Sequence, residues 1–175
     1  MLTADQKLDF DALLPAAAQA GSRRSALKLA LGVGYAAAAG PLMAQTAIKT
    51  SSEGLRTGEF SFEVNGFKVP VFFAAPAGKS NLPVVLVIHE IFGVHEYIAD
   101  VTRRLAKVGY LAIAPEFFTR AGEPTELGTV AEIMSQIVAK TPDQQVLGDI
   151  EAALKWAGAN NGDLSRVGMT GFCWG

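Results

Sequence analysis

A regular alternation of hydrophobic and polar positions starts near residue 58. Phenylalanine and valine at every second position of residues 60–64 alternate with polar neighbours, which is the period of a half-buried strand. Asn65-Gly66 follows and is a strong hairpin signal, because both residues tolerate the positive φ angles of a two-residue turn. Residues 67–75 are therefore expected to return as the second strand of a hairpin.

Downstream of the hairpin, apolar runs alternate with amphipathic segments. The runs at 84–88 and 110–114 are continuously apolar, as in strands that are covered on both faces, and 166–170 predicts a last strand. Apolar residues recur at helical spacing over residues 97–108, 125–139 and 142–159. This order predicts an α/β fold with a mostly parallel sheet and an antiparallel N-terminal hairpin.

Two helix ends carry specific signals. Gly109 follows the first amphipathic segment and is expected to terminate that helix in a left-handed conformation. Thr141 is a candidate N-cap for the last helix, and Pro142 suits its first turn because proline lacks the N–H that is unpaired there anyway.

The N-terminal region has a different composition. Arg23 and Arg24 precede an alanine-rich apolar run at 29–44 that glycines and a proline interrupt. The run is less apolar than the roughly 20 residues of a membrane-spanning helix. It resembles a twin-arginine export signal, which predicts a leader and signal peptide at 1–44, a linker at 45–57, and export to the periplasm or beyond by the twin-arginine machinery. An uncleaved membrane anchor and an amphipathic tail are the alternatives.

Composition excludes several classes of protein. The 175 residues suffice for one domain, and 50% hydrophobic against 18% charged residues exclude intrinsic disorder. A net charge of -2 provides no basic surface for nucleic acid. The single cysteine excludes an internal disulfide, and with only two histidines beside it a four-ligand Cys/His zinc site is disfavoured.

Candidate chemistry begins at the C-terminal end of the chain. Gly171-Phe172-Cys173-Trp174-Gly175 has the G-x-S-x-G pattern of a nucleophile elbow, with cysteine in place of serine. An elbow holds its nucleophile in strained backbone geometry, so side chains two residues to either side would collide. A helix N-terminus after the elbow would favour the thiolate. The alternative is a buried structural cysteine.

A second candidate group follows the apolar run at 84–88. In an α/β-hydrolase layout, the loop of His89-Glu90-Ile91-Phe92-Gly93 provides one backbone donor of an oxyanion hole, and the residue after the nucleophile provides the other. The expected donors are the N–H groups of Ile91 and Trp174. Glu90 is a candidate acid at a strand end, with a solvated loop carboxylate as the alternative. His89 is expected to bond to neighbouring backbone, and His95 to lie on the surface at the start of a helix.

Together these residues resemble the dienelactone hydrolase (carboxymethylenebutenolidase) family. The resemblance covers about residues 58–175, and its matching stretches are 87–93, 104–110, 114–118, 148–153 and 167–175. It implies an α/β-hydrolase fold and hydrolysis of enol-lactones or related small esters through a thioester, with no metal or organic cofactor. It also implies that Cys173 is the nucleophile, that Glu90 helps to ionise the thiol, and that Ile91 and Trp174 donate to the oxyanion.

The sequence departs from the family pattern in three respects. First, the aspartate and histidine of the implied Cys-His-Asp triad belong after the elbow and are not found before Gly175. Second, residues 125–164 contain no arginine that could bind a substrate carboxylate. Third, Glu116 stands where many relatives have aspartate. The expectation is the front half of a hydrolase, inactive alone, with its last strand at a sheet edge or with one face bare. The alternatives are a cysteine hydrolase or amidotransferase of flavodoxin-like fold, and a non-catalytic binding or scaffold protein.

Overall fold

The computed structural model describes residues 48–175 and begins with the predicted hairpin. Strands β1 (Leu55–Val64) and β2 (Phe67–Pro76) are antiparallel and are joined through Asn65 and Gly66, whose φ angles are 51° and 81°.

 Both turn residues therefore have the positive φ that a two-residue hairpin requires, and the predicted hairpin is confirmed. β1 begins at Leu55, so its first residues lie inside the predicted linker. The predicted leader and export signal at 1–44 lie outside the described residues.

The sheet continues from the hairpin through three more strands. β3 (Leu82–Ile88), β4 (Leu111–Pro115) and β5 (Gly162–Gly171) complete the order β1-β2-β4-β3-β5. β2 and β4 are antiparallel, whereas β3 is parallel to both β4 and β5. The structure therefore confirms an α/β fold with an antiparallel start, and its parallel part contains both candidate motifs.

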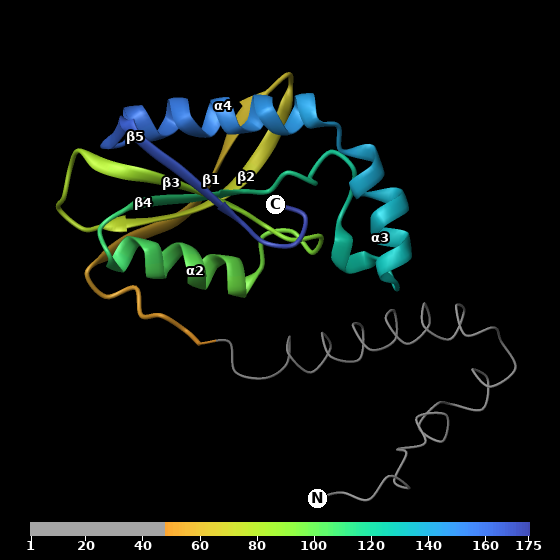
Figure 1. The fold of residues 1–175 in the computed structure, drawn as a ribbon, viewed down its shortest axis with the longest axis horizontal. Coiled ribbons are helices and arrows are strands. Elements are labelled where there is room, and N and C mark those ends of the chain that lie inside the picture. Colours follow the sequence, from red (N-terminus) through yellow and green to blue (C-terminus); the bar gives the residue numbers. More distant parts are fainter. Residues whose placement is uncertain (1–47) are drawn as a thin grey trace, which may run out of the picture. The chain divides into compact units, whose positions relative to one another are not determined.

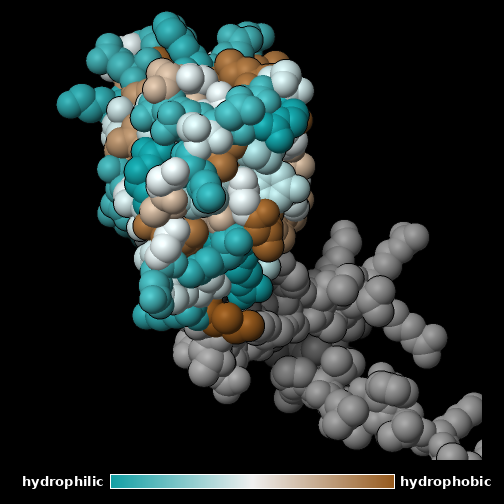
Figure 2. Space-filling model, turned by 90° about the vertical axis from the view of Figure 1, so that its left-hand side faces the viewer, coloured by the Kyte–Doolittle hydropathy of each residue, from teal (hydrophilic) through white to brown (hydrophobic). Residues whose placement is uncertain are grey.

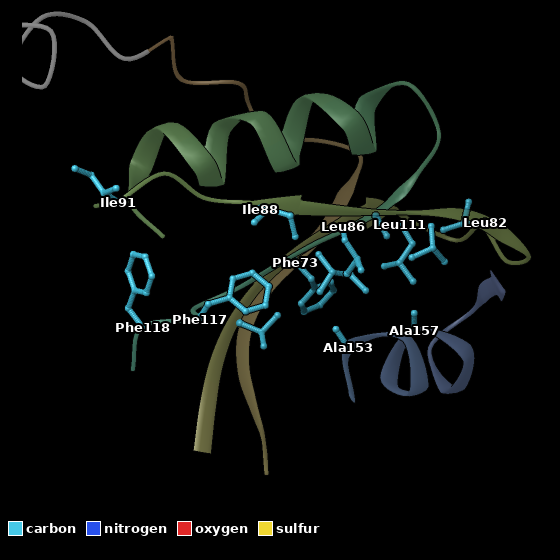
Figure 3. Close-up of a cluster of buried hydrophobic side chains, with 14 of the residues drawn as sticks. Phe73, Leu82, Leu86, Ile88, Ile91, Leu111, Phe117, Phe118, Ala153 and Ala157 are labelled. Atoms are coloured by element: carbon cyan, nitrogen blue, oxygen red, sulfur yellow. The ribbon is translucent and has the colours of Figure 1, made fainter. Parts of the chain in front are cut away.

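Helices cover both faces of this sheet (Figure 1). α2 (Glu96–Lys107) lies on one face and α4 (Asp143–Ala159) on the other. The larger hydrophobic cluster lies between the sheet and α4, where the small side chains of Ala153 and Ala157 let the helix approach closely (Figure 3). A smaller cluster around Val87, Ile98 and Ala114 packs α2 against the opposite face. Burial on both faces explains the continuously apolar sequences of β3 and β4.

The predicted single helix at 125–139 is wrong. The structure has two 3₁₀ turns, η3 (Pro124–Glu126) and η4 (Val138–Lys140), with the short helix α3 (Val130–Gln136) between them. The Thr129 hydroxyl accepts the N–H of Glu132 at 3.2 Å and donates to the Glu132 carboxylate at 2.9 Å. This N-cap starts the helix at Val130, so local capping overrides the longer apolar period.

The other two helix-end predictions have different outcomes. Gly109 has φ 105° directly after α2, and its N–H donates to the Ala106 carbonyl at 3.0 Å, which confirms its terminating role. The predicted N-cap of α4 is wrong by one residue, because Pro142 occupies the N-cap. The hydroxyl of Thr141 instead donates to the Ile137 carbonyl at 3.0 Å and completes the preceding turn.

Strand β5 lies at an edge of the described sheet, as expected from the sequence. It pairs with β3, and the side chains of Leu164, Val167 and Met169 are exposed. The face shown in Figure 2 is mostly hydrophilic, with small and separate hydrophobic areas. Within the described residues, we find no helix that combines the length and the apolar character needed to cross a membrane.

Candidate active site

The parallel pairing of β3 and β5 brings the two candidate motifs together. Ile88, the last residue of β3, is paired with Gly171, the last residue of β5. The loop containing Glu90 and the elbow containing Cys173 therefore leave the same edge of the sheet from neighbouring strands. The carboxyl ends of parallel strands are where open α/β sheets bind ligands.

The elbow has the strained geometry predicted for a nucleophile. Cys173 has φ 57°, in the left-handed region that costs a residue with a side chain about 1–2 kcal/mol. Its turn is closed by a hydrogen bond from the Gly175 N–H to the Phe172 carbonyl at 3.0 Å. The thiol is exposed, so the alternative of a buried structural cysteine is wrong. A helix after the elbow is not among the described residues.

The two elbow glycines are required by close backbone approach. A Cβ atom on Gly175 would lie 2.7 Å from the Cβ of Ile88 and 2.8 Å from its carbonyl oxygen. A Cβ on Gly171 would collide with the backbone of Gly175. The steric reason inferred from the sequence is therefore confirmed, and these contacts also press the elbow against the end of β3.

Replacing Gly171 with alanine is expected to displace the elbow. Because the colliding atoms belong to the backbone, we expect the free energy of unfolding to fall by about 1–3 kcal/mol. Gly168→Ala is the matched control, since a Cβ there has no heavy atom within 4 Å in the same strand. Urea denaturation of both variants measures the difference, and equal stabilities would contradict the observed packing of the elbow.

Glu90 is held by His95. Glu90 Oε1 lies 2.9 Å from His95 Nε2, and the second carboxylate oxygen, Oε2, is buried without a hydrogen-bond partner among the described residues. Burial by itself raises the pKa of the Glu90 carboxyl, but the hydrogen bond from His95, the Glu90 backbone N–H and the two histidines when protonated outweigh burial and hold the pKa below its usual value. Glu90 is thus a partly buried, paired carboxylate rather than a solvated loop acid.

His95 differs in part from its predicted position. It is the N-cap of α2, which confirms that it starts a helix. Its side chain is only 19% exposed and is paired with Glu90, so the prediction of a surface residue is wrong. No local pattern indicates this contact, because the two residues meet only after the intervening loop turns back.

His89 bonds to the backbone, as predicted. It is fully buried; its Nδ1 donates to the Glu90 carbonyl at 2.6 Å, and its Nε2 accepts the Phe117 N–H at 3.1 Å. These bonds define the neutral tautomer with the proton on Nδ1. Nε2 also lies 3.3 Å from Glu116 Oε1, a contact that becomes an ion pair only when His89 is protonated. The indole ring of Trp174 stacks on His89, with ring centroids 5.5 Å apart.

Glu116 joins the end of β4 to the loop after β3. Its carboxylate accepts the Val94 N–H at 2.6 Å and the Phe118 N–H at 3.1 Å. Burial acts to raise the pKa of the Glu116 carboxyl, whereas His89 when protonated and these two N–H donors lower it below its usual value. Gly93, with φ 76°, lies so close to this carboxylate that a side chain there would displace it. Glu116 therefore fixes the loop that contains Ile91.

The two candidate oxyanion donors lie on these adjacent loops. Neither the Ile91 N–H nor the Trp174 N–H donates a hydrogen bond to another described residue. Unpaired backbone N–H groups are uncommon in folded proteins, and an oxyanion hole is a setting that leaves them available.

Comparison with known proteins places this geometry in a family. Residues 69–175 match the Dienelactone hydrolase family. The chain belongs to that family. It is 45% identical over 155 residues to a "Putative carboxymethylenebutenolidase" of Methylorubrum extorquens, covering 88% of this chain and 53% of the relative. A protein of the same description from Salmonella typhi is 48% identical over 143 residues, covering 81% of this chain and 53% of the relative. The chain thus spans about half the length of the curated relatives it matches.

Solved structures agree with the family assignment. The crystal structure of a "Putative Dienelactone Hydrolase" from Klebsiella pneumoniae is similar with a TM-score of 0.67 and 45% sequence identity, covering 69% of this chain and 51% of that chain. A "Dienelactone Hydrolase-like Promiscuous Phospotriesterase" from metagenomic libraries is similar with a TM-score of 0.57 at 25% identity, covering 70% and 51%. The fold of this dienelactone hydrolase family member is that of an α/β-hydrolase, which excludes the flavodoxin-like alternative.

One buried ion pair in this family member was not predicted. Asp149 on α4 is fully buried and accepts two hydrogen bonds from Arg120, at 2.7 and 2.8 Å. The Arg120 side chain also lies over the ring of Phe67, 5.4 Å from its centroid. The signal for this pair in the sequence was an aspartate inside the apolar stripe of a helix, which needs a buried cation.

Metal-ligating clusters and cavities were sought in the described part of the chain. Residues 48–175 contain no group of three histidine, cysteine or carboxylate side chains that could hold a metal ion. A pocket of about 270 Å³ beside β2 is lined by Glu59, Glu116 and Glu123 among others, and Cys173 does not line it. This pocket is therefore distinct from the surroundings of Cys173.

Proposed function

We propose that this chain provides the nucleophile and the oxyanion hole for hydrolysis of enol-lactones or related small esters. The observation that carries the proposal is Cys173 itself, exposed at φ 57° between two sterically required glycines. Strained backbone geometry at an exposed nucleophilic side chain is typical of a catalytic site. The curated relatives named carboxymethylenebutenolidases support the lactone as the substrate class.

In the proposed reaction, the thiol proton of Cys173 passes to the Glu90 carboxylate and the sulfur attacks the carbonyl carbon of the substrate. The carbon–sulfur bond forms as the carbonyl oxygen takes the negative charge, and the N–H groups of Ile91 and Trp174 stabilise that oxygen. The carbonyl then re-forms, the bond to the alkoxy oxygen breaks, and that oxygen takes the proton held by Glu90, leaving a thioester. Water hydrolyses the thioester, with the histidine and aspartate that the family resemblance implies after the elbow.

Acylation by p-nitrophenyl acetate tests the first half of this reaction. We expect one p-nitrophenolate to be released per chain and one acetyl group to be found on Cys173, the chain's only cysteine, by mass spectrometry. Donors to an oxyanion typically accelerate such steps by about a hundredfold or more, so the folded chain should react that much faster than the same chain unfolded in urea. Equal rates in the folded and unfolded chain would refute the proposal.

The same experiment decides between an enzyme and a non-catalytic scaffold. A scaffold has no reason to activate a thiol, and its cysteine would react like that of an unstructured peptide. The exposed side chain of Cys173 and the strained backbone beneath it favour the enzyme.

We also propose that residues 1–44 direct export through the twin-arginine machinery. The proposal is supported by the Arg23-Arg24 pair and the moderately apolar run after it. Residues 1–50 fused to a fluorescent reporter that folds in the cytoplasm should carry it to the periplasm. Arg23→Lys combined with Arg24→Lys should block that transport, and normal export of the double variant would contradict the proposal.

A further inference from the structure

The two oxygens of the Glu90 carboxylate have different surroundings. Oε1 receives a hydrogen bond from His95 Nε2 at 2.9 Å. Oε2 is buried and has no hydrogen-bond partner among the described residues. A buried carboxylate oxygen without a donor is costly in a folded protein, which indicates that this oxygen has a use beyond stability.

The orientation of His95 is fixed by the start of α2. As the N-cap, its Nδ1 accepts the N–H of Tyr97 at 3.3 Å, so in the neutral ring the proton is on Nε2. That N–H is the one that donates to Glu90 Oε1. The Tyr97 ring also stacks beside the imidazole, and it contacts Phe172 of the elbow with ring centroids 5.7 Å apart. The first turn of α2 thus joins Glu90 to the elbow.

We propose that His95 is a positioning residue: it holds Oε1 of Glu90 so that Oε2 is the oxygen that accepts the thiol proton of Cys173. This inference rests on the proposed function. Fixing one oxygen of the carboxylate prevents the side chain from rotating, and a positioned base is more effective than a mobile one. The capping role and the positioning role use different nitrogens of one ring, so they can be separated by substitution.

The titratable groups near Glu90 come from three elements. His95 approaches from α2, and His89 precedes Glu90 at the end of β3. Glu116 directly follows β4, and its carboxylate lies 3.3 Å from His89 Nε2. The hydrogen bond from His95 is the largest of the effects that lower the pKa of Glu90, so removing it is expected to raise that pKa.

Two substitutions separate the roles. His95→Asn keeps a side-chain acceptor for the Tyr97 N–H, because asparagine is a strong N-cap, but it is too short to donate to Glu90. His95→Gln can place an amide N–H near Glu90 Oε1 but caps helices poorly. If His95 only caps α2, Cys173 in the His95→Asn variant should react with the same pH dependence as in the native chain. If His95 positions Glu90, the His95→Gln variant should have the native pH dependence instead.

The readout is the rate of Cys173 alkylation by iodoacetamide as a function of pH. In that reaction the sulfur–carbon bond forms, iodide leaves, and the thiol proton is lost. We expect the rise in rate that follows Glu90 ionisation to move upward by roughly one pH unit in His95→Asn and to stay near its native position in His95→Gln. The urea midpoint should be unchanged in His95→Asn.

Glu90→Gln distinguishes a failure of this inference from a failure of the proposed function. This substitution should remove the rise in alkylation rate that follows Glu90 ionisation. Adding His95→Asn to it should not change the pH profile further. A native profile in His95→Asn, together with an altered profile in Glu90→Gln, would overturn the role of His95 alone. An unchanged profile in Glu90→Gln would overturn the proposed role of Glu90, and with it this inference.

Discussion

Replacing Cys173 with glycine is expected to abolish acylation and to make the fold more stable than the alanine variant. Both substitutions remove the only thiol, so acylation should fall by at least about a thousandfold, as in other enzymes that lose their nucleophile. Glycine adopts the left-handed conformation without the penalty of a Cβ atom, whereas alanine retains it. We expect the glycine variant to exceed the alanine variant by about 1 kcal/mol in free energy of unfolding.

Mass spectrometry after p-nitrophenyl acetate treatment and urea denaturation measure the two effects. Persistent acetylation of either variant at a single site would show that Cys173 is not the nucleophile. Equal stability of the two variants would contradict the positive φ at this position. The two outcomes are independent, because the first concerns the thiol and the second concerns the backbone.

Arg120→Leu is expected to cause the largest loss of stability. It leaves the Asp149 carboxylate fully buried with no cation beside it, and breaking a buried pair in this way costs about 3–5 kcal/mol. The double variant Arg120→Leu, Asp149→Leu removes both charges and should recover much of the loss. Urea denaturation of the single and double variants measures this difference.

Arg166→Leu is the matched control for the loss of an arginine. Arg166 pairs with Asp163 at 2.7 Å, but its side chain is 50% exposed, so water replaces the missing partner. Its substitution should change the stability much less than Arg120→Leu. Similar losses in the two variants would show that the buried Arg120–Asp149 pair has no special importance.

Local chemistry made the hairpin and the elbow predictable. Asn65-Gly66 fixes a turn because the two residues accept positive φ angles, and the alternation on either side fixes which faces are buried. The elbow is recognisable from its two glycines: a side chain at Gly171 would collide with Gly175 in the same turn, whereas one at Gly175 would collide with Ile88 of the neighbouring strand. Continuous apolar runs identified the strands that are covered on both faces.

Boundaries and side-chain pairs were less predictable. The apolar period over 125–139 suggested one helix, but the hydroxyl of Thr129 and the carboxylate of Glu132 form a cap that starts a shorter one. The start of α4 shifted because the Thr141 hydroxyl bonds backward to Ile137. In both cases the backbone group that one threonine hydroxyl bonds to decides where the helix begins, and the hydrophobic pattern contains no information on that bond.

The sequence by itself determined the strand and helix order, the two motifs and the strain at Cys173, because each depends on residues close together in the chain. Only the tertiary structure decided that His95 forms a hydrogen bond with Glu90 and that Arg120 forms an ion pair with Asp149. Those pairs depend on where loops turn back and which way side chains point. Hydrophobic periodicity specifies the buried face of an element, and it contains no information on which polar groups meet beyond that element's ends.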